Sequence, residues 1–64
     1  MNITLDEIRS KAPDGATHYY RQYNKVIIYF IVQPDGSQKK VTPSYGHKTW
    51  VYCDYKLSKL IPLN

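Results

Sequence analysis

The strongest constraint on the fold is an unbroken run of seven apolar residues, 26–32. β-Branched and aromatic side chains dominate this run, which is typical of a strand buried on both faces. A chain of 64 residues has little material to cover two faces of a sheet, because a domain of this size buries only about 60% of the surface its unfolded chain exposes. We therefore expect the other aromatic residues, or a partner, to cover this strand.

A short helix is expected before the first strand. Thr4 and Glu7 have the Thr-x-x-Glu spacing of a capping box, Ile3 can pack against Ile8, and Pro13 ends the helix. The helix has only about two turns, so it must dock on the sheet to persist. It spans about two strands, which leaves the remaining surface to tyrosines, to the C-terminal tail or to a second molecule. Some aromatic surface is expected to stay uncovered.

Four strand segments follow, joined by short connections. Turns are predicted at Asn24-Lys25 and at residues 34–36, where Pro, Asp and Gly follow one another. The predicted fold class is α+β: one domain over residues 1–64, with a short N-terminal helix and an antiparallel meander of about four strands. The first and fourth strands would form the edges. The tail, 56–64, could form one helical turn or run extended, and we favour the extended or irregular form. The strand segments are 17–23, 26–32, 38–42 and 49–55.

The net charge of +4 is unevenly distributed. Residues 1–16 hold two basic and three acidic residues, a balance of −1, whereas residues 17–64 hold seven basic and two acidic residues, a balance of +5. A basic body suits nucleic acid or an acidic protein surface as partner. Lysines that solvate strand edges and turns are the alternative interpretation.

Little in the sequence indicates catalysis. A catalytic site would have to use His18, His47, Cys53, Asp54 or the tyrosines. Cys–His chemistry would pair His47 with Cys53, and nothing places these two in contact. The spacings match no zinc pattern, and the glycines lie in three separate turns rather than in a phosphate-binding loop. We expect no enzyme activity, no cofactor and no metal. The single cysteine predicts a reducing compartment, the cytoplasm, and the sequence predicts neither a signal peptide nor a membrane span.

Aromatic residues make up 14% of the chain, and seven of them are tyrosines. Three interpretations remain open. The rings could form the core of a small sheet, or one face could stack bases while lysines and arginines hold phosphates. They could also anchor a protein partner inside a basic rim. The phosphate-binding set would be Arg21, Lys25, Lys39, Lys40 and Lys48.

The segment 12–19, Ala-Pro-Asp-Gly-Ala-Thr-His-Tyr, resembles small accessory proteins of tailed bacteriophages. Those proteins have a short helix, an Ala-Pro-acidic-Gly-Ala-Thr-His-aromatic motif, strands rich in Trp and Tyr, and a terminal Leu-x-Pro-Leu, which reads here Leu-Ile-Pro-Leu at 60–63. This chain departs from them in having one Trp. The resemblance implies a phage origin and a non-catalytic role in host takeover or anti-defence, and it assigns no functional residues.

The leading hypothesis is a small protein that binds and modulates a host bacterial protein through an aromatic–basic surface. The partner's surface would be acidic or adapted to nucleic acid. Direct binding of single-stranded nucleic acid and a homodimeric structural module are the alternatives. The predicted partner-binding residues are Tyr20, Arg21, Tyr23, Tyr45, Lys48, Trp50 and Tyr52.

Overall fold

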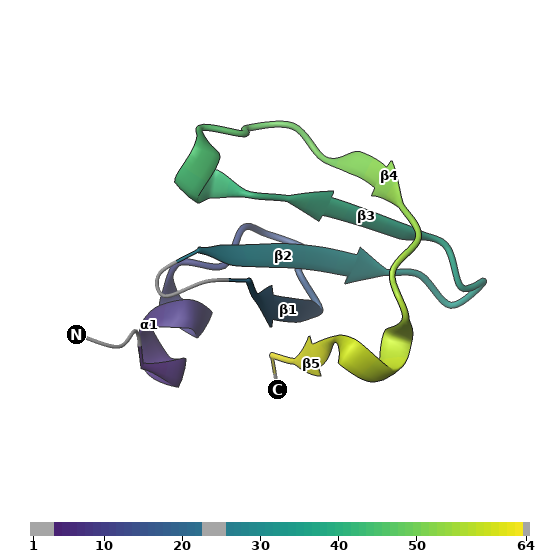
Figure 1. The fold of residues 1–64 in the computed structure, drawn as a ribbon, viewed down its shortest axis with the longest axis horizontal. Helices are drawn as coiled ribbons and strands as arrows, with labels where there is room; N and C mark the ends of the chain where they lie inside the picture. Colours follow the sequence, from purple (N-terminus) through teal and green to yellow (C-terminus); the bar gives the residue numbers. More distant parts are fainter. Residues whose placement is uncertain (1–3, 23–25, 64) are drawn as a thin grey trace.

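A computed structural model describes residues 4–22 and 26–63 of the chain (Figure 1). The turn predicted at Asn24-Lys25, the contact predicted for Ile3, and Tyr23 lie outside the described residues. One α-helix precedes the strands, and two short 3-10 helices, η1 and η2, lie among them. The elements are α1 (Leu5–Ser10), β1 (His18–Arg21), β2 (Ile27–Val32), β3 (Gln38–Val41), η1 (Pro43–Tyr45), β4 (Val51–Cys53), η2 (Leu57–Lys59) and β5 (Ile61–Pro62).

The strands form one antiparallel sheet in the order β4-β3-β2-β1-β5 (Figure 1). The α+β class and the antiparallel sheet are confirmed, but the prediction of about four strands is wrong, because the described residues form five. The fifth comes from the tail, where Ile61 pairs with Tyr19 and Pro62 with His18. β1 is therefore not an edge strand, and the edges are β4 and β5. The tail contains both a helical turn, η2, and an extended piece, β5.

The ends of α1 follow the local sequence. Thr4 accepts a hydrogen bond at Oγ1 from the backbone N–H of Glu7, with an N···O distance of 3.2 Å, so the predicted cap is present. The helix ends at Ser10, and the Lys11 N–H still reaches the Glu7 carbonyl at 3.0 Å. The chain leaves the helix before Pro13 because the residue preceding a proline is disfavoured in the helical region.

The turn predicted at 34–36 connects β2 and β3. Gly36 has a φ of +93°, which a glycine adopts without strain, and its N–H donates to the Gln33 carbonyl at 2.9 Å. Asp35 accepts bonds from the N–H and the hydroxyl of Ser37, at 2.9 and 2.7 Å. These bonds to the carboxylate hold the pKa of Asp35 below its ordinary value. The turn thus forms from its own residues, without help from the core.

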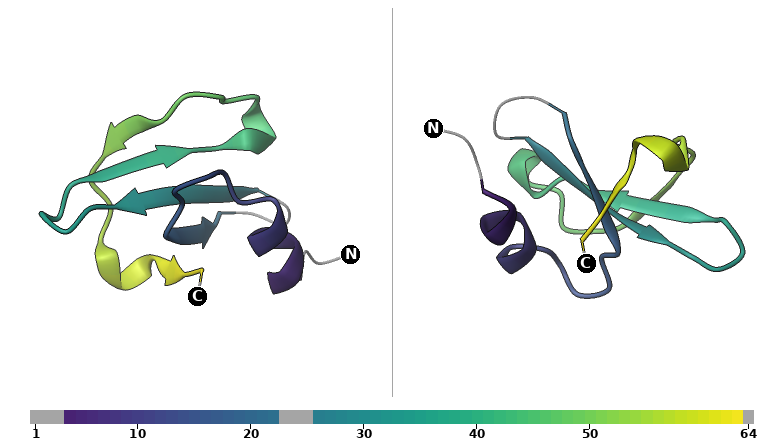
Figure 2. Two further views of the ribbon diagram at one scale, coloured as in Figure 1. Left: turned by 180° about the vertical axis from the view of Figure 1, so that it is seen from behind. Right: turned by 90° about the horizontal axis from the view of Figure 1, so that it is seen from below.

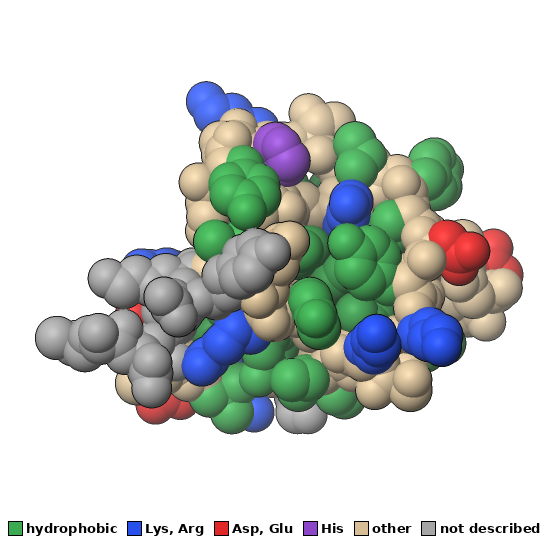
Figure 3. Space-filling view, in the orientation of Figure 1, with side chains coloured by type: hydrophobic (Ala, Val, Ile, Leu, Met, Phe, Trp, Pro, Cys, Tyr) green, Lys and Arg blue, Asp and Glu red, His purple; other side chains and the backbone are tan. Residues whose placement is uncertain are grey.

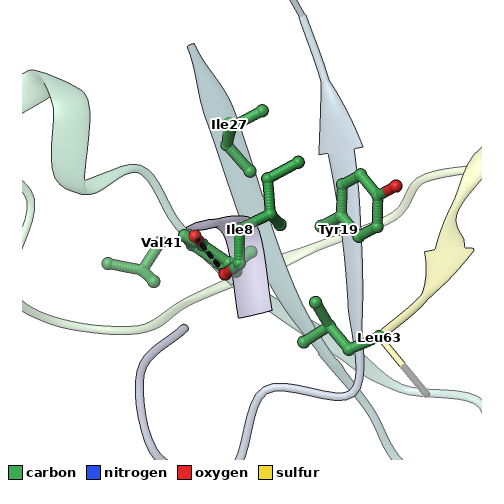
Figure 4. Packing of buried hydrophobic residues seen from close by; sticks show 6 residues of the cluster. Ile8, Tyr19, Ile27, Val41 and Leu63 are labelled. Carbon is green, nitrogen blue, oxygen red and sulfur yellow. Dashed lines mark hydrogen bonds between the residues drawn. The ribbon is translucent and has the colours of Figure 1, made fainter. Parts of the chain in front are cut away.

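The two faces of the sheet are covered by different ends of the chain. The first, which we call the helix face, packs against α1, and the second, the tail face, packs against the segment that runs from β4 through η2 to β5. Figure 2 shows α1 and η2 on opposite sides of the sheet. The helix-face cluster, shown in Figure 4, consists of Ile8, Tyr19, Ile27, Tyr29, Val41 and Leu63. The tail-face cluster consists of Ile28, Phe30 and Leu60, with Tyr20, Val32, Cys53 and Tyr55 packed against it.

The central strand is therefore covered by its own chain. Residues 27–30 of β2 are all buried, and Phe30 has no exposed surface. Tyrosines and the C-terminal tail cover the part of β2 that α1 leaves open, and both were among the covers expected from the sequence. Among the described residues, the exposed tyrosines are Tyr45 and Tyr52, which lie outside the central strand β2.

Candidate functional site

The structure divides the predicted partner-binding residues into two groups. Tyr20 and Arg21 lie at the end of β1, whereas the segment from η1 to β4 carries Tyr45, Lys48, Trp50 and Tyr52; Tyr23 is outside the described residues. β2 and β3 separate β1 from β4. With strands about 4.8 Å apart, β1 and β4 are on the order of 14 Å from one another across the sheet.

Residues that lie directly opposite one another in an antiparallel pair share a face, so the register assigns each side chain a side. Tyr20 lies opposite Ile28 and is on the tail face, where it is half-buried with its ring centroid 6.4 Å from that of Tyr55. Arg21 lies opposite Ile27 and is on the helix face. The two β1 residues therefore face opposite sides, and neither is brought together with the β4 residues.

β4 carries the most exposed ring among the described residues. Tyr52 lies opposite Lys39 on the helix face and is 77% exposed. The Nζ of Lys39 is 5.1 Å from the centroid of the Tyr52 ring, a cation–π contact. Trp50, just before the strand, is half-buried and packs against the helix-face cluster. Trp50 thus belongs in part to the core, and Tyr52 does not.

A second cation lies on the other side of the same strand. Val51 is 50% exposed and lies opposite Lys40, which the register places on the tail face with Phe30. The Nζ of Lys40 is 5.3 Å from the centroid of the Tyr55 ring. Tyr55 packs edge-on against Phe30, with centroids 5.0 Å apart and planes at 65°. Figure 3 shows hydrophobic side chains gathered over this face, with lysine and arginine side chains among them and along the margin.

The residues on the two faces beside β4, the free edge of the sheet, make up what we call the β4 edge surface: Lys39 and Tyr52 lie on the helix face, and Lys40 and Val51 lie on the tail face, where Tyr55 contacts Lys40. Sequence reasoning placed Tyr52 in the candidate site but gave Lys39 and Lys40 only to the nucleic-acid alternative. The signal for them was present: two consecutive lysines in a strand point to opposite faces, so each side of β4 receives one cation. The surface consists of Lys39, Lys40, Val51, Tyr52 and Tyr55.

Tyr45 and Lys48 lie beside this surface, in η1 and in the loop that leads to β4. Tyr45 is exposed, and its ring centroid is 6.0 Å from that of His47 in an edge-on arrangement. Gly46 ends η1 with a φ of +79°. A shallow hollow next to the loop is lined by His47, Lys48, Thr49 and Val51.

The chemistry of Cys53 is that of a partly buried thiol. Its Sγ is 3.8 Å from Oε1 of Gln38 and donates to it. Burial raises the pKa of the Cys53 thiol above its ordinary value, an effect that nearby Lys40 opposes and Asp54 reinforces. A thiol with a raised pKa is a poor nucleophile at neutral pH, because the thiolate is the reactive form.

The described residues offer neither a metal-ligand cluster nor a membrane-spanning helix. Residues 4–22 and 26–63 contain no cluster of three or more His, Cys, Asp or Glu side chains able to hold a metal ion. Over the same ranges, no helix has the length and apolar character needed to cross a bilayer.

Comparisons of the chain with protein-family models, with curated proteins and with solved structures found no match.

Proposed function

We propose that this protein binds and modulates a host bacterial protein in the bacterial cytoplasm, and that the β4 edge surface makes the contact. The observation that carries the proposal is Tyr52, a ring 77% exposed on an edge strand with the Lys39 ammonium beside it. The phage-type role in host takeover or anti-defence comes from the resemblance of the 12–19 motif.

The side chains suit a protein interface. Tyrosine combines a large apolar ring with a polar tip, and it is among the residues that dominate binding energy in interfaces. Val51, half-exposed on the opposite side of β4, offers further apolar area within the same strand. Apolar surface ringed by cations is typical of a protein-binding patch rather than of a solvated edge.

The distribution of charge favours an acidic partner. Residues 1–37 hold four basic and four acidic residues, a net charge of zero. Residues 38–63 hold five lysines and only Asp54, so 5 − 1 = +4, the entire net charge of the chain. β3, β4 and the tail therefore carry the positive field, and an acidic partner would be attracted to this end of the molecule.

Single-stranded nucleic acid is the second candidate, and Lys40 next to the Tyr55 ring favours it. Sheet-based binders of this kind stack two or three bases on rings presented flat on one face. Here Phe30 is fully buried, Tyr20 is half-buried, and Tyr55 stands edge-on to Phe30 at 65°. These rings are occupied with one another, so the tail face offers a poor stacking platform, and the protein partner is the stronger proposal.

The homodimer, with two sheets packed face to face, has less support. Each face of the sheet is already covered by a segment of its own chain, α1 on one side and the tail on the other. Two copies would also bring together two molecules of net charge +4. Sedimentation at two concentrations tests this alternative, and a monomer at both would remove it.

Affinity capture from bacterial lysate, with and without nuclease, tests the proposed function. The bait is the full chain, compared with Tyr52→Ser and with Leu57→Ser, which changes another half-exposed apolar residue away from β4. We expect one host protein to be enriched by the wild type and by Leu57→Ser, to survive nuclease, and to be lost with Tyr52→Ser. No enrichment above background, or enrichment that nuclease abolishes, would overturn the proposal.

A further inference from the structure

The two edges of the sheet differ in how well they are protected from pairing with another chain. β5 is two residues long and contains Pro62, which has no backbone N–H to offer. β4 contains Val51, Tyr52 and Cys53, with neither charge nor proline among them. Unpaired backbone groups on an edge strand attract a further strand, and natural edges are usually blocked by charged residues or proline. β4 lacks that protection in its own sequence.

The backbone of β4 is paired on one side only. The register joins Lys40 to Val51, Lys39 to Tyr52 and Gln38 to Cys53, and β4 is the last strand in the sheet order. The outer side of β4 therefore presents N–H and C=O groups in the geometry of a sheet. A strand added there would lie about 4.8 Å away, and its side chains would alternate between the helix face and the tail face.

Each face beside β4 carries one lysine. Lys39 extends over the Tyr52 ring, so its ammonium lies toward β4 rather than over its own strand. Lys40 is on the opposite face, where Val51 is its neighbour on β4; its ammonium contacts the Tyr55 ring and would turn from that ring toward an added strand. Because adjacent residues of an added strand point to opposite faces, two consecutive acidic residues would meet one lysine each.

We propose that β4 accepts an extended acidic segment of the partner protein as a sixth strand of the sheet. This deepens the proposed function and rests on it: backbone hydrogen bonds supply the affinity, Tyr52 covers the added strand, and Lys39 and Lys40 select consecutive carboxylates. A second copy of this chain is the less suitable occupant, because residues 38–63 of that copy hold five lysines and the single Asp54, and its consecutive acidic residues, Asp6 and Glu7, lie in the helix α1 rather than in an extended segment.

The test uses the full chain and the capped peptide TVEEYEEVT, followed by amide NMR and by titration. We expect the peptide to slow hydrogen exchange at one or more of the backbone amides of Val51, Tyr52 and Cys53. Two further peptides have the same sequence but carry N-methyl groups on every other residue. In one peptide the methyl groups lie along one edge of the extended strand, and in the other peptide they lie along the opposite edge. Methylation prevents backbone pairing along that edge and leaves the charge of the peptide unchanged. We expect one of the two to bind at least tenfold more weakly than the parent peptide.

A pair of charge variants tests selection by the lysines. We expect Lys39→Gln with Lys40→Gln to weaken binding of the peptide at least tenfold. The control, Lys11→Gln with Lys59→Gln, removes the same charge from two exposed residues elsewhere and should weaken binding much less.

Several results would overturn the inference. One is that the parent peptide and both N-methylated peptides bind with equal affinity, and another is that the two charge variants weaken peptide binding equally. The inference also fails if the protein associates with itself through β4, or if oligodeoxythymidylate rather than the peptide slows hydrogen exchange in β4. If the peptide does not bind while host capture still depends on Tyr52, the added strand is wrong and the proposed function stands. If capture fails as well, both are wrong.

Discussion

The side-chain amide of Gln38 makes two hydrogen bonds to the backbone of Tyr55, as the backbone of a neighbouring strand would. Nε2 of Gln38 donates to the Tyr55 carbonyl, and Oε1 accepts from the Tyr55 N–H, each over 2.9 Å. Gln38 is 4% exposed and lies 17 residues from Tyr55 in the chain. The pair fixes the point at which the chain leaves β4 and crosses the tail face, and with it the position of the ring beside Lys40.

Replacing Gln38 with Leu should destabilise the fold more than its size suggests. The change preserves apolar packing but leaves the N–H and carbonyl of Tyr55 without their partners, at a cost of about 1–3 kcal/mol for each group that stays buried. Urea unfolding gives the free energy. Gln33→Leu, in an exposed position before the turn, is the control and should change stability by less than about 0.5 kcal/mol. Equal effects of the two changes would contradict the role assigned to Gln38.

Tyr29 should make the protein sensitive to alkali. Burial raises the pKa of Tyr29, and its hydroxyl donates to the Ile8 carbonyl at 2.8 Å (Figure 4). The folded state therefore keeps the proton longer than the unfolded state does. Its stabilising contribution is complete below the unfolded pKa, near 10, and is lost as the pH rises from there through the raised folded value.

Tyr29→Phe isolates this effect. At neutral pH the variant should be less stable by about 1 kcal/mol, because the bond to Ile8 is missing. As the pH rises above about 10, the stability of the wild type should approach that of the variant. Chemical denaturation at a series of pH values provides the measurement, and a constant difference across the series would show that Tyr29 does not titrate as inferred.

Two leucines of the tail should respond very differently to truncation. Leu60 is 6% exposed within the tail-face cluster, whereas Leu57 is 51% exposed. Leu60→Ala should cost about 2–5 kcal/mol, enough to unfold much of a domain this small. Leu57→Ala, the same chemical change, should cost less than about 1 kcal/mol. Similar thermal midpoints for the two variants would mean that the tail does not cover this face.

Trp50 and Tyr52, two residues apart, should separate folding from binding. Trp50→Ala should lower stability by about 2 kcal/mol or more, because the indole packs against the helix-face cluster. Tyr52→Ala should leave stability within about 0.5 kcal/mol, because the ring is mostly in solvent. Thermal unfolding measures both, and capture of the host protein with Tyr52→Ala shows whether binding alone is lost. A large loss of stability with Tyr52→Ala would place its ring in the core instead.

Local signals in the sequence predicted the local structure well. The cap at Thr4 and the turn at residues 34–36 formed as predicted, because each depends on hydrogen bonds among neighbours in the chain. Six of the seven residues of the apolar run, Ile27–Val32, form the central strand, and residues 27–30 are buried between the two layers that cover it. The predicted strand 49–55 shortened to Val51–Cys53, since its last residues leave the sheet where Gln38 binds Tyr55.

The candidate site was only partly predictable. Composition identified aromatic and basic residues as a group, but it could not separate Tyr52 in solvent from Trp50 in the core, because alternation gives both the same face. Alternation predicts that Lys39 and Lys40 point to opposite faces, but only the register between β3 and β4 shows that they lie opposite Tyr52 and Val51.

The sequence alone determined the class of the fold, the helix, the turn and the strand that had to be buried, because these follow from the order of neighbouring residues. The tertiary structure decided that the tail becomes a fifth strand and that β4 remains the unprotected edge. It did so because pairing and burial depend on contacts between distant segments, as in the bond from Arg9 Nε to the Leu63 carbonyl, 2.6 Å long across 54 positions.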